Sequence, residues 1–106
     1  MLAVAGQIGR DADGRLVSGE FSNQFAAALD NVLRVVNAAG GSAPEIVAMT
    51  VFVVDRLQYR AARTALSPLW RQRMGKHYPA MTVVEVSGLL DDGALVEIQA
   101  LAVLAS

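Results

Sequence analysis

The sequence predicts an α+β fold with the element order β-β-α-β-α-β-β, in which a mixed sheet carries two helices on one face. Three observations support this prediction. Two segments repeat apolar residues at helical spacing, and four others are apolar or β-branched in the manner of strands. The chain has 106 residues, which is the length of one domain, so we expect a single domain over residues 1–106.

The first predicted strand runs from Leu2 to Ile8, a short apolar segment that Gly9 closes. Asp13-Gly14 is a turn signal, and we expect Arg15–Val17 to return as a short hairpin partner.

The first helix is predicted from Phe21 to Ala39, because its apolar residues form one stripe along a helix. These residues are Phe21, Phe25, Ala28, Leu29, Val32, Val35, Val36 and Ala39. Ser18 or Ser22 is a candidate N-cap, and Gly40-Gly41 allows the left-handed backbone that ends a helix.

The second half contains three further strands and the second helix. Ile46–Val54 is apolar on both of its faces, which is typical of a strand that is covered on both sides. A helix is predicted from Leu57 to Met74, and Pro68 should kink or break it. Strands are then predicted over Ala80–Val86 and Ala94–Leu104, separated by a turn.

Composition indicates self-association. Apolar residues and glycine together make up about 60% of the sequence, against roughly 45–50% in an average soluble domain. A domain this small has too little interior for so many apolar side chains. The two helices cover one face of the sheet, although Ile46–Val54 and Ala94–Leu104 offer apolar residues to both faces. We therefore expect another copy of the chain to cover the second face.

The same composition excludes several classes of protein. The net charge is −1 and the basic residues are scattered, so we expect no nucleic-acid partner. Cysteine is absent, which excludes disulfides, thiolate metal sites and a thiol nucleophile. No apolar segment reaches the roughly 20 residues that cross a bilayer, and the N-terminus does not resemble a signal peptide. We therefore expect a cytoplasmic protein without membrane contact.

Glu97 is the candidate functional residue that the strand pattern singles out. In Ala94–Leu104 the residues that alternate with Glu97 and Gln99 are all apolar, so these two side chains face away from the helices. A carboxylate on such a face is a candidate general acid/base or an anchor for a ligand. The alternative is a solvated rim residue, or one paired with an arginine across the interface. His77 is the sole histidine, and we expect neither a metal site nor a cofactor.

The order of several short motifs resembles the RidA family (YjgF-like, reactive imine/enamine deaminases). The motifs are Ala5-Gly6-Gln7-Ile8, Gln24-Phe25, Leu29-Asp30-Asn31-Val32, Ala38-Ala39-Gly40-Gly41, Thr50-Val51-Phe52-Val53 with Asp55, Tyr78-Pro79-Ala80, Val84-Glu85-Val86 and Gly93-Ala94-Leu95-Val96-Glu97-Ile98-Gln99-Ala100. No single motif is specific, but together they span the chain with compatible spacing.

The resemblance implies a chorismate-mutase-like homotrimer, with the sheets packed around a threefold axis and the helices outside. Clefts between subunits would bind a small carboxylate-bearing molecule, and the typical reaction hydrolyses an enamine or imine to a 2-oxo acid and ammonia. Glu97 matches the family's water-orienting glutamate. Gly6 matches a glycine whose backbone holds the ligand, Ala5 stands in place of the usual serine, and Gln99 replaces a second glutamate.

Met81 is the main departure from the family pattern. It stands where the family's Pro-Ala-Arg motif has the arginine that grips the substrate carboxylate, and a thioether cannot form that ion pair. The resemblance therefore implies an imine- or enamine-hydrolysing trimer whose substrate is less anionic or more apolar than 2-aminoacrylate. Arg10 or an arginine of the second helix is a candidate for the missing cation.

Two alternatives remain open at this point. The first is a non-catalytic trimer that binds a metabolite or has a regulatory role. The second is a ferredoxin-like dimer, which fits less well because that fold places a hairpin between its helices.

Overall fold

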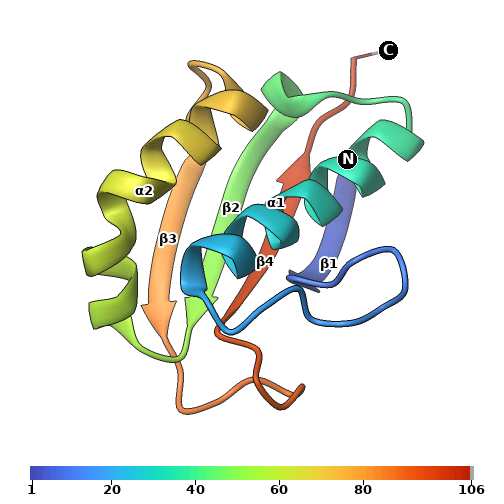
Figure 1. Ribbon diagram of the computed structural model, residues 1–106. Coiled ribbons are helices and arrows are strands. Elements are labelled where there is room, and N and C mark those ends of the chain that lie inside the picture. Colours follow the sequence, from blue (N-terminus) through green and yellow to red (C-terminus); the bar gives the residue numbers. More distant parts are fainter. Residues whose placement is uncertain (106) are drawn as a thin grey trace.

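The computed structural model describes residues 1–105 as a four-stranded sheet with two helices on one face (Figure 1). The strands are β1 (Leu2–Ile8), β2 (Ile46–Val53), β3 (Ala80–Glu85) and β4 (Val96–Ala102), in the spatial order β1-β4-β2-β3. The helices are α1 (Phe21–Ala38) and α2 (Arg56–Met74), and a short 3-10 helix, η1 (Ala43–Glu45), precedes β2. β4 is antiparallel to β1 and β2, whereas β2 and β3 are parallel, so the predicted mixed sheet is confirmed.

The core lies between the sheet and the helices. In β4 the residues that face the helices are buried, and their neighbours Glu97 and Gln99 face the other way, as the alternation predicts. α1 contributes the predicted apolar stripe, apart from Val35 and Ala39, which are exposed. Fully buried side chains of the core include Phe25, Leu29, Val32, Val36, Ile46, Val51, Val53, Val96 and Ile98.

Gln24 is a buried polar residue on the apolar face of α1, with a relative exposure of 1%. Its Nε2 donates hydrogen bonds to the backbone oxygens of Ser18 (2.7 Å) and Gly93 (3.0 Å). Its Oε1 accepts one from the backbone N–H of Leu95 (2.8 Å). Because all of these groups are satisfied, burial of the amide is tolerated, and α1 is connected to the loops before α1 and before β4.

The sequence-based expectations can be compared with the structure at the start of α1, at the first turn and at Pro68. The expected N-cap, Ser18 or Ser22, is wrong, because Glu20 is the residue at the N-cap position and makes no side-chain cap hydrogen bond.

Residues 15–17 return as the expected short hairpin partner without joining the four-stranded sheet. Leu16 and Arg10 form an antiparallel bridge, and the backbone N–H groups of Asp11 and Val17 donate to the oxygens of Arg15 (2.8 Å) and Gly9 (2.9 Å).

Of the two effects expected at Pro68, the break is wrong, because α2 continues to Met74. Pro68 lies on an exposed side of the helix, where water can satisfy the carbonyl that loses its hydrogen bond.

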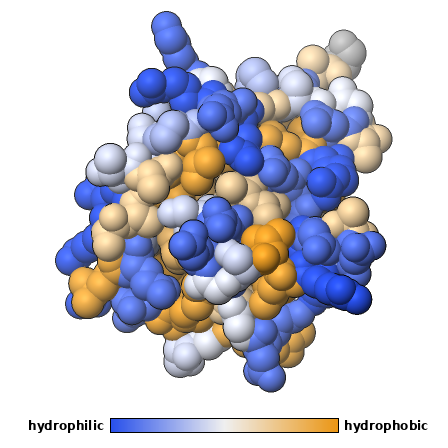
Figure 2. Space-filling view, viewed as in Figure 1, coloured by the Kyte–Doolittle hydropathy of each residue, from blue (hydrophilic) through white to orange (hydrophobic). Residues whose placement is uncertain are grey.

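The face of the sheet opposite the helices is not covered by any described element (Figure 1). Its outward residues follow from the alternation and the strand register: Ala3, Ala48, Thr50, Phe52, Ala80, Thr82, Val84, Glu97, Gln99 and Leu101. Most of these are apolar or small, and Glu97 is the only charged residue among them. On the helix side, by contrast, hydrophilic residues spread between separate hydrophobic patches (Figure 2).

Neither described helix is long and apolar enough to cross a membrane.

Glu45 attaches the end of the chain to η1. Its carboxylate accepts hydrogen bonds from the backbone N–H groups of Ala105 and Ser42, and its own carbonyl accepts one from Val103 (2.9 Å). The N–H groups of Ala105 and Ser42 favour the ionised carboxylate and lower the pKa of Glu45 below its usual 4.5.

A pH dependence of stability follows from this lowered pKa. The ionised carboxylate stabilises the fold above about pH 4.5, and the contribution is lost as the pH falls through the lowered value. We expect the wild type to be more stable than Glu45→Gln at neutral pH, with the difference disappearing on acidification. Urea unfolding of both proteins across this range measures it, and a gap independent of pH would contradict the assignment.

Candidate functional site

A cavity of about 500 Å³ lies at one end of β1 and β4, and we call it the Glu97 cavity. β1 contributes Gly6, Gln7 and Ile8 to its lining, α1 contributes Asn31, and β4 contributes Glu97. The loops that follow β1 and precede β4 complete the wall, with Arg10, Asp11, Ala12, Gly14, Leu90 and Asp91. The predicted residues Gly6 and Glu97, which are far apart in the sequence, therefore meet in one cavity.

The absence of a side chain at Gly6 allows Glu97 to lie against β1. A Cβ atom at residue 6 would lie 2.6 Å from Oε2 of Glu97 and 2.7 Å from its Cδ, closer than nonbonded atoms approach. β1 also has an irregular register between Val4 and Gln7, so the strand is locally distorted beside the carboxylate. Glycine at this position thus sets the direction of the Glu97 side chain.

Of the charged groups in this cavity, Arg10 and Asp91 form an ion pair with each other, whereas Glu97 has no such partner among the described residues. The ion pair links the two loops at the rim. Asn31 donates from Nδ2 to the backbone oxygens of Ile8 (3.0 Å) and Arg10 (3.0 Å) and holds the first loop on α1. Within residues 1–105 the half-buried carboxylate of Glu97 has no hydrogen-bond partner. Glu97 can therefore accept hydrogen bonds from a water molecule or ligand, whereas Asp91 already neutralises Arg10.

The remaining predicted site residues do not all lie at this cavity. Ala5 is exposed beside Gly6, and Gln99 is exposed on the open face two residues from Glu97. Met81 pairs with the buried Met49, so its side chain faces the helices. One chain therefore does not bring Met81 together with Glu97, because they lie on opposite faces of the sheet.

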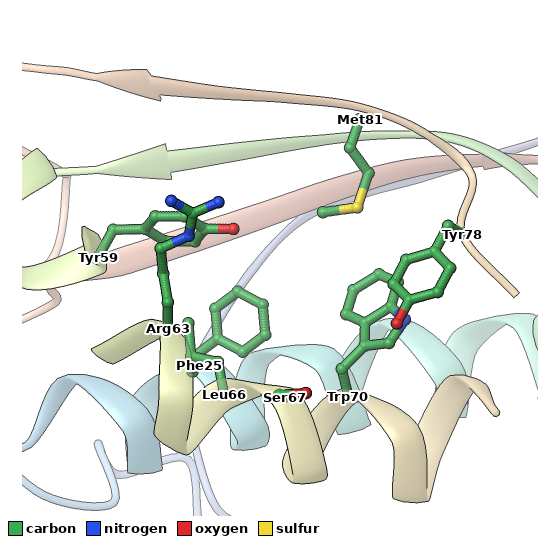
Figure 3. A pocket seen from close by; sticks show the side chains of 8 residues that line it. All are labelled: Phe25, Tyr59, Arg63, Leu66, Ser67, Trp70, Tyr78 and Met81. Atoms are coloured by element: carbon green, nitrogen blue, oxygen red, sulfur yellow. The ribbon is translucent and has the colours of Figure 1, made fainter. Parts of the chain in front are cut away.

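Met81 instead lines a second cavity, of about 330 Å³, between α2 and β3 (Figure 3). We call it the Met81 cavity. Its other lining residues are Phe25, Tyr59, Arg63, Leu66, Ser67, Trp70 and Tyr78. The rings of Trp70 and Tyr78 are stacked, with centroids 5.7 Å apart and planes inclined by 10°. Sequence reasoning missed this cavity, because aromatic residues at helical spacing look the same whether they fill a core or line a hollow.

His77 and the acidic residues do not assemble a metal site in the part of the chain that the structure describes, where no group of three or more potential ligands was found. The Nε2 atom of His77 lies 2.7 Å from the backbone oxygen of Ile46, and its carbonyl accepts a hydrogen bond from the indole of Trp70 (3.1 Å). His77 thus connects the loop before β3 to the start of β2 and to α2.

The order of strands, the two helices on one face and the glycine-supported glutamate define an α+β protein of the YjgF type. Residues 1–104 match the family model described as Endoribonuclease L-PSP, and the chain belongs to this family, the RidA/YjgF family. The resemblance inferred from the short motifs is therefore confirmed.

Relatives of known sequence and structure agree with this assignment. The chain is 33% identical over 103 residues to a 2-iminobutanoate/2-iminopropanoate deaminase of Salmonella typhimurium, covering 97% of this chain and 79% of that protein. It is 32% identical over 102 residues to a RutC family protein of Pyrococcus horikoshii, covering 95% and 77%. The crystal structure of the YjgF gene product of E. coli matches with a TM-score of 0.83 at 31% identity, covering 95% and 78% of the two chains. That of E. coli TdcF with bound serine matches with a TM-score of 0.84 at 28% identity, covering 97% and 80%.

Gly6, which lines the Glu97 cavity, and Gly9, which lies just after β1, should respond differently to substitution by alanine. Gly6→Ala meets the flexible end of a side chain, so we expect Glu97 to turn away while the free energy of unfolding changes by less than about 1 kcal/mol. Gly9→Ala meets the backbone of α1, with Cβ 2.6 Å from the oxygen of Gln24, and should lose about 3 kcal/mol or more. Urea unfolding measures both values. Equal losses for the two variants would contradict the contact at Gly6.

Proposed function

We propose that the chain is one RidA-like domain that forms a homotrimer and hydrolyses an imine or enamine in clefts between subunits, where Glu97 positions the attacking water. The observation that carries the proposal is the unpartnered carboxylate of Glu97, held beside Gly6 on a sheet face that is otherwise uncharged. Relatives named 2-iminobutanoate/2-iminopropanoate deaminase support the reaction class. TdcF, described with bound serine, supports a small-molecule ligand.

Association through the open face of the sheet is supported by its composition. Leu101 remains 39% exposed in the isolated chain, and its neighbours across the sheet are alanines, which allow close approach of a second surface. An extended apolar surface of this kind is typical of an interface between proteins. The separation of Glu97 and Met81 on opposite faces of the sheet also supports association, since a cleft that contained both residues would need two chains.

The proposed reaction requires one group that can move a proton. Glu97 accepts a hydrogen bond from a water molecule and takes its proton as the water oxygen bonds to the imine carbon. The carboxyl group then protonates the nitrogen, which gives a carbinolamine. The carbon–nitrogen bond breaks as the hydroxyl proton passes to nitrogen, and ammonia leaves behind a carbonyl compound. The overall reaction consumes one water molecule.

Met81 decides which substrates fit the proposed cleft. A thioether offers no charge-assisted hydrogen bond to a carboxylate, so the proposal favours a substrate more apolar or less anionic than 2-aminoacrylate. The same residue supports the second candidate, a trimer that binds a metabolite or acts in regulation without catalysis, because the loss of the substrate clamp is compatible with the loss of turnover.

Ammonia release separates the two candidates. We expect the wild type to release ammonia from a bulky apolar imino acid and to act poorly on freshly generated 2-aminoacrylate. Glu97→Gln should reduce the rate by about 100-fold or more, because it loses the group that transfers the proton. Met81→Arg should gain activity on 2-aminoacrylate. The control Asp13→Asn removes an exposed turn carboxylate and should leave the rates unchanged.

The enzyme proposal fails if wild type and Glu97→Gln release ammonia at the same rate. A tightly bound metabolite that is never turned over by the wild type would favour the second candidate.

Light scattering tests the trimer. The chain mass is 11.2 kDa, and we expect three times that mass in solution. Leu101→Glu places a charge on the open face and should give monomers, because an unpaired charge is costly to bury. Leu57→Glu is the matched control: Leu57 is 62% exposed on α2, and this variant should remain trimeric. A monomeric wild type at micromolar concentration would contradict the assembly.

A further inference from the structure

Arg10 and Glu97 carry opposite charges and line the same cavity, but they are not paired with each other. Ile8 is the residue of β1 that pairs with Glu97 across the sheet, and Arg10 follows Ile8 by two positions. Residues offset by two positions across a pair of strands lie about 7–8 Å apart, which is within reach of a long side chain such as arginine. The absence of an ion pair between Arg10 and Glu97 therefore needs a physical cause.

Two contacts hold the guanidinium group of Arg10 elsewhere. Its Nη2 atom donates to Oδ2 of Asp91, and its Nη1 atom donates to the backbone oxygen of Gly14 (3.4 Å). The ion pair with Asp91 is the charge-assisted contact of the two and is the stronger one. Asp91 is therefore the carboxylate that competes with Glu97 for this cation.

Asp11, the other aspartate that lines the cavity, has a different role. Its Oδ1 atom accepts hydrogen bonds from the backbone N–H groups of Asp13 (2.9 Å) and Arg15 (3.1 Å), so its carboxylate stabilises its own turn. The only ion pair of Arg10 among residues 1–105 is the one with Asp91.

The turn that carries Asp91 is anchored. The backbone oxygen of Asp91 accepts a hydrogen bond from the N–H of Ala94 (3.2 Å), and Gly93 supplies the positive φ of +84° within the same turn. The buried amide of Gln24 then binds the backbone oxygen of Gly93 (3.0 Å) and the N–H of Leu95 (2.8 Å). The carboxylate that engages Arg10 thus stands at a position fixed by α1 and by the start of β4.

We propose that Asp91 is a positioning residue, which engages Arg10 and so keeps the guanidinium group off the carboxylate of Glu97. This inference rests on the proposed function, in which Glu97 binds and deprotonates the attacking water. A guanidinium group paired with Glu97 would occupy the oxygens that accept hydrogen bonds from that water. A positive charge beside a carboxylate also favours its ionised form, which makes it a weaker proton acceptor.

The position of Arg10 is measured without turnover by double-mutant cycles on urea unfolding at one protein concentration. The two substitutions of the cycle are Arg10→Gln and Glu97→Gln, made once in the wild type and once in Asp91→Asn. We expect no coupling between them in the wild type. In Asp91→Asn we expect a favourable coupling of up to about fivefold in the folding equilibrium constant, the size of a partly exposed ion pair.

Asp92→Asn is the matched control for this cycle. Asp92 is the next residue of the same turn, is exposed, forms no ion pair within residues 1–105 and does not line the cavity. The same change of charge at this position should leave Arg10 and Glu97 uncoupled. Coupling already present in the wild type, or none in Asp91→Asn, would overturn the proposal.

Ammonia release measures the consequence for the reaction. Asp91→Asn should lower kcat about fivefold with little change in KM, because the bound water and not the substrate loses its partner. Adding Arg10→Gln to Asp91→Asn should restore kcat, whereas damage to the turn would not be repaired by the removal of Arg10. Asp91→Glu keeps the carboxylate and should retain the rate, as should Asp92→Asn.

The positioning role is wrong if Asp91→Asn is as active as the wild type, or if the double variant stays as slow as Asp91→Asn. A wild type that releases no ammonia would refute the proposed hydrolysis instead. The unfolding cycles would still decide whether Asp91 holds Arg10 away from Glu97, so the two failures are distinct.

Discussion

The antiparallel pairing of β2 with β4 in the middle of the sheet is the constraint on which the remaining structure depends. Its register pairs Val51 with Ile98 on the helix side and Phe52 with Glu97 on the open side. A shift of one residue would bury the carboxylate in the core and expose the apolar set, so the register is strongly determined by the burial of one face. Once this pair is in place, the positions of β1 and β3 decide what surrounds each exposed side chain.

Two cavities with different linings lie at opposite edges of the sheet. At the edge next to β1, Gly6 leaves space for Glu97, and a cavity with a carboxylate and several backbone groups results. At the edge next to β3, α2 stands over the strand so that Met81, Trp70 and Arg63 line a cavity with an apolar interior and a cationic end.

Much of this arrangement could be predicted from local patterns. The alternation in residues 94–104 predicted that Glu97 faces away from the helices, and the apolar stripe predicted which side of α1 is buried. The short motifs from Ala5 to Ala100 indicated the family. Other features could not be predicted, because they depend on contacts between distant segments. Gln24 is buried because two loops present backbone groups to its amide.

The sequence by itself determined the four strands of the sheet, the two helices, their order along the chain, which side of β4 faces the helices and the identity of Glu97 as a candidate. Each of these follows from periodicity or from motif spacing within one segment. Only the tertiary structure decided which residues share a cavity. The close approach of Glu97 to Gly6 depends on how β1 lies against β4, and the presence of Met81 and Arg63 in one cavity depends on how α2 lies along β3. Such distances are set by packing between elements that lie far apart in the chain, and no local pattern encodes them.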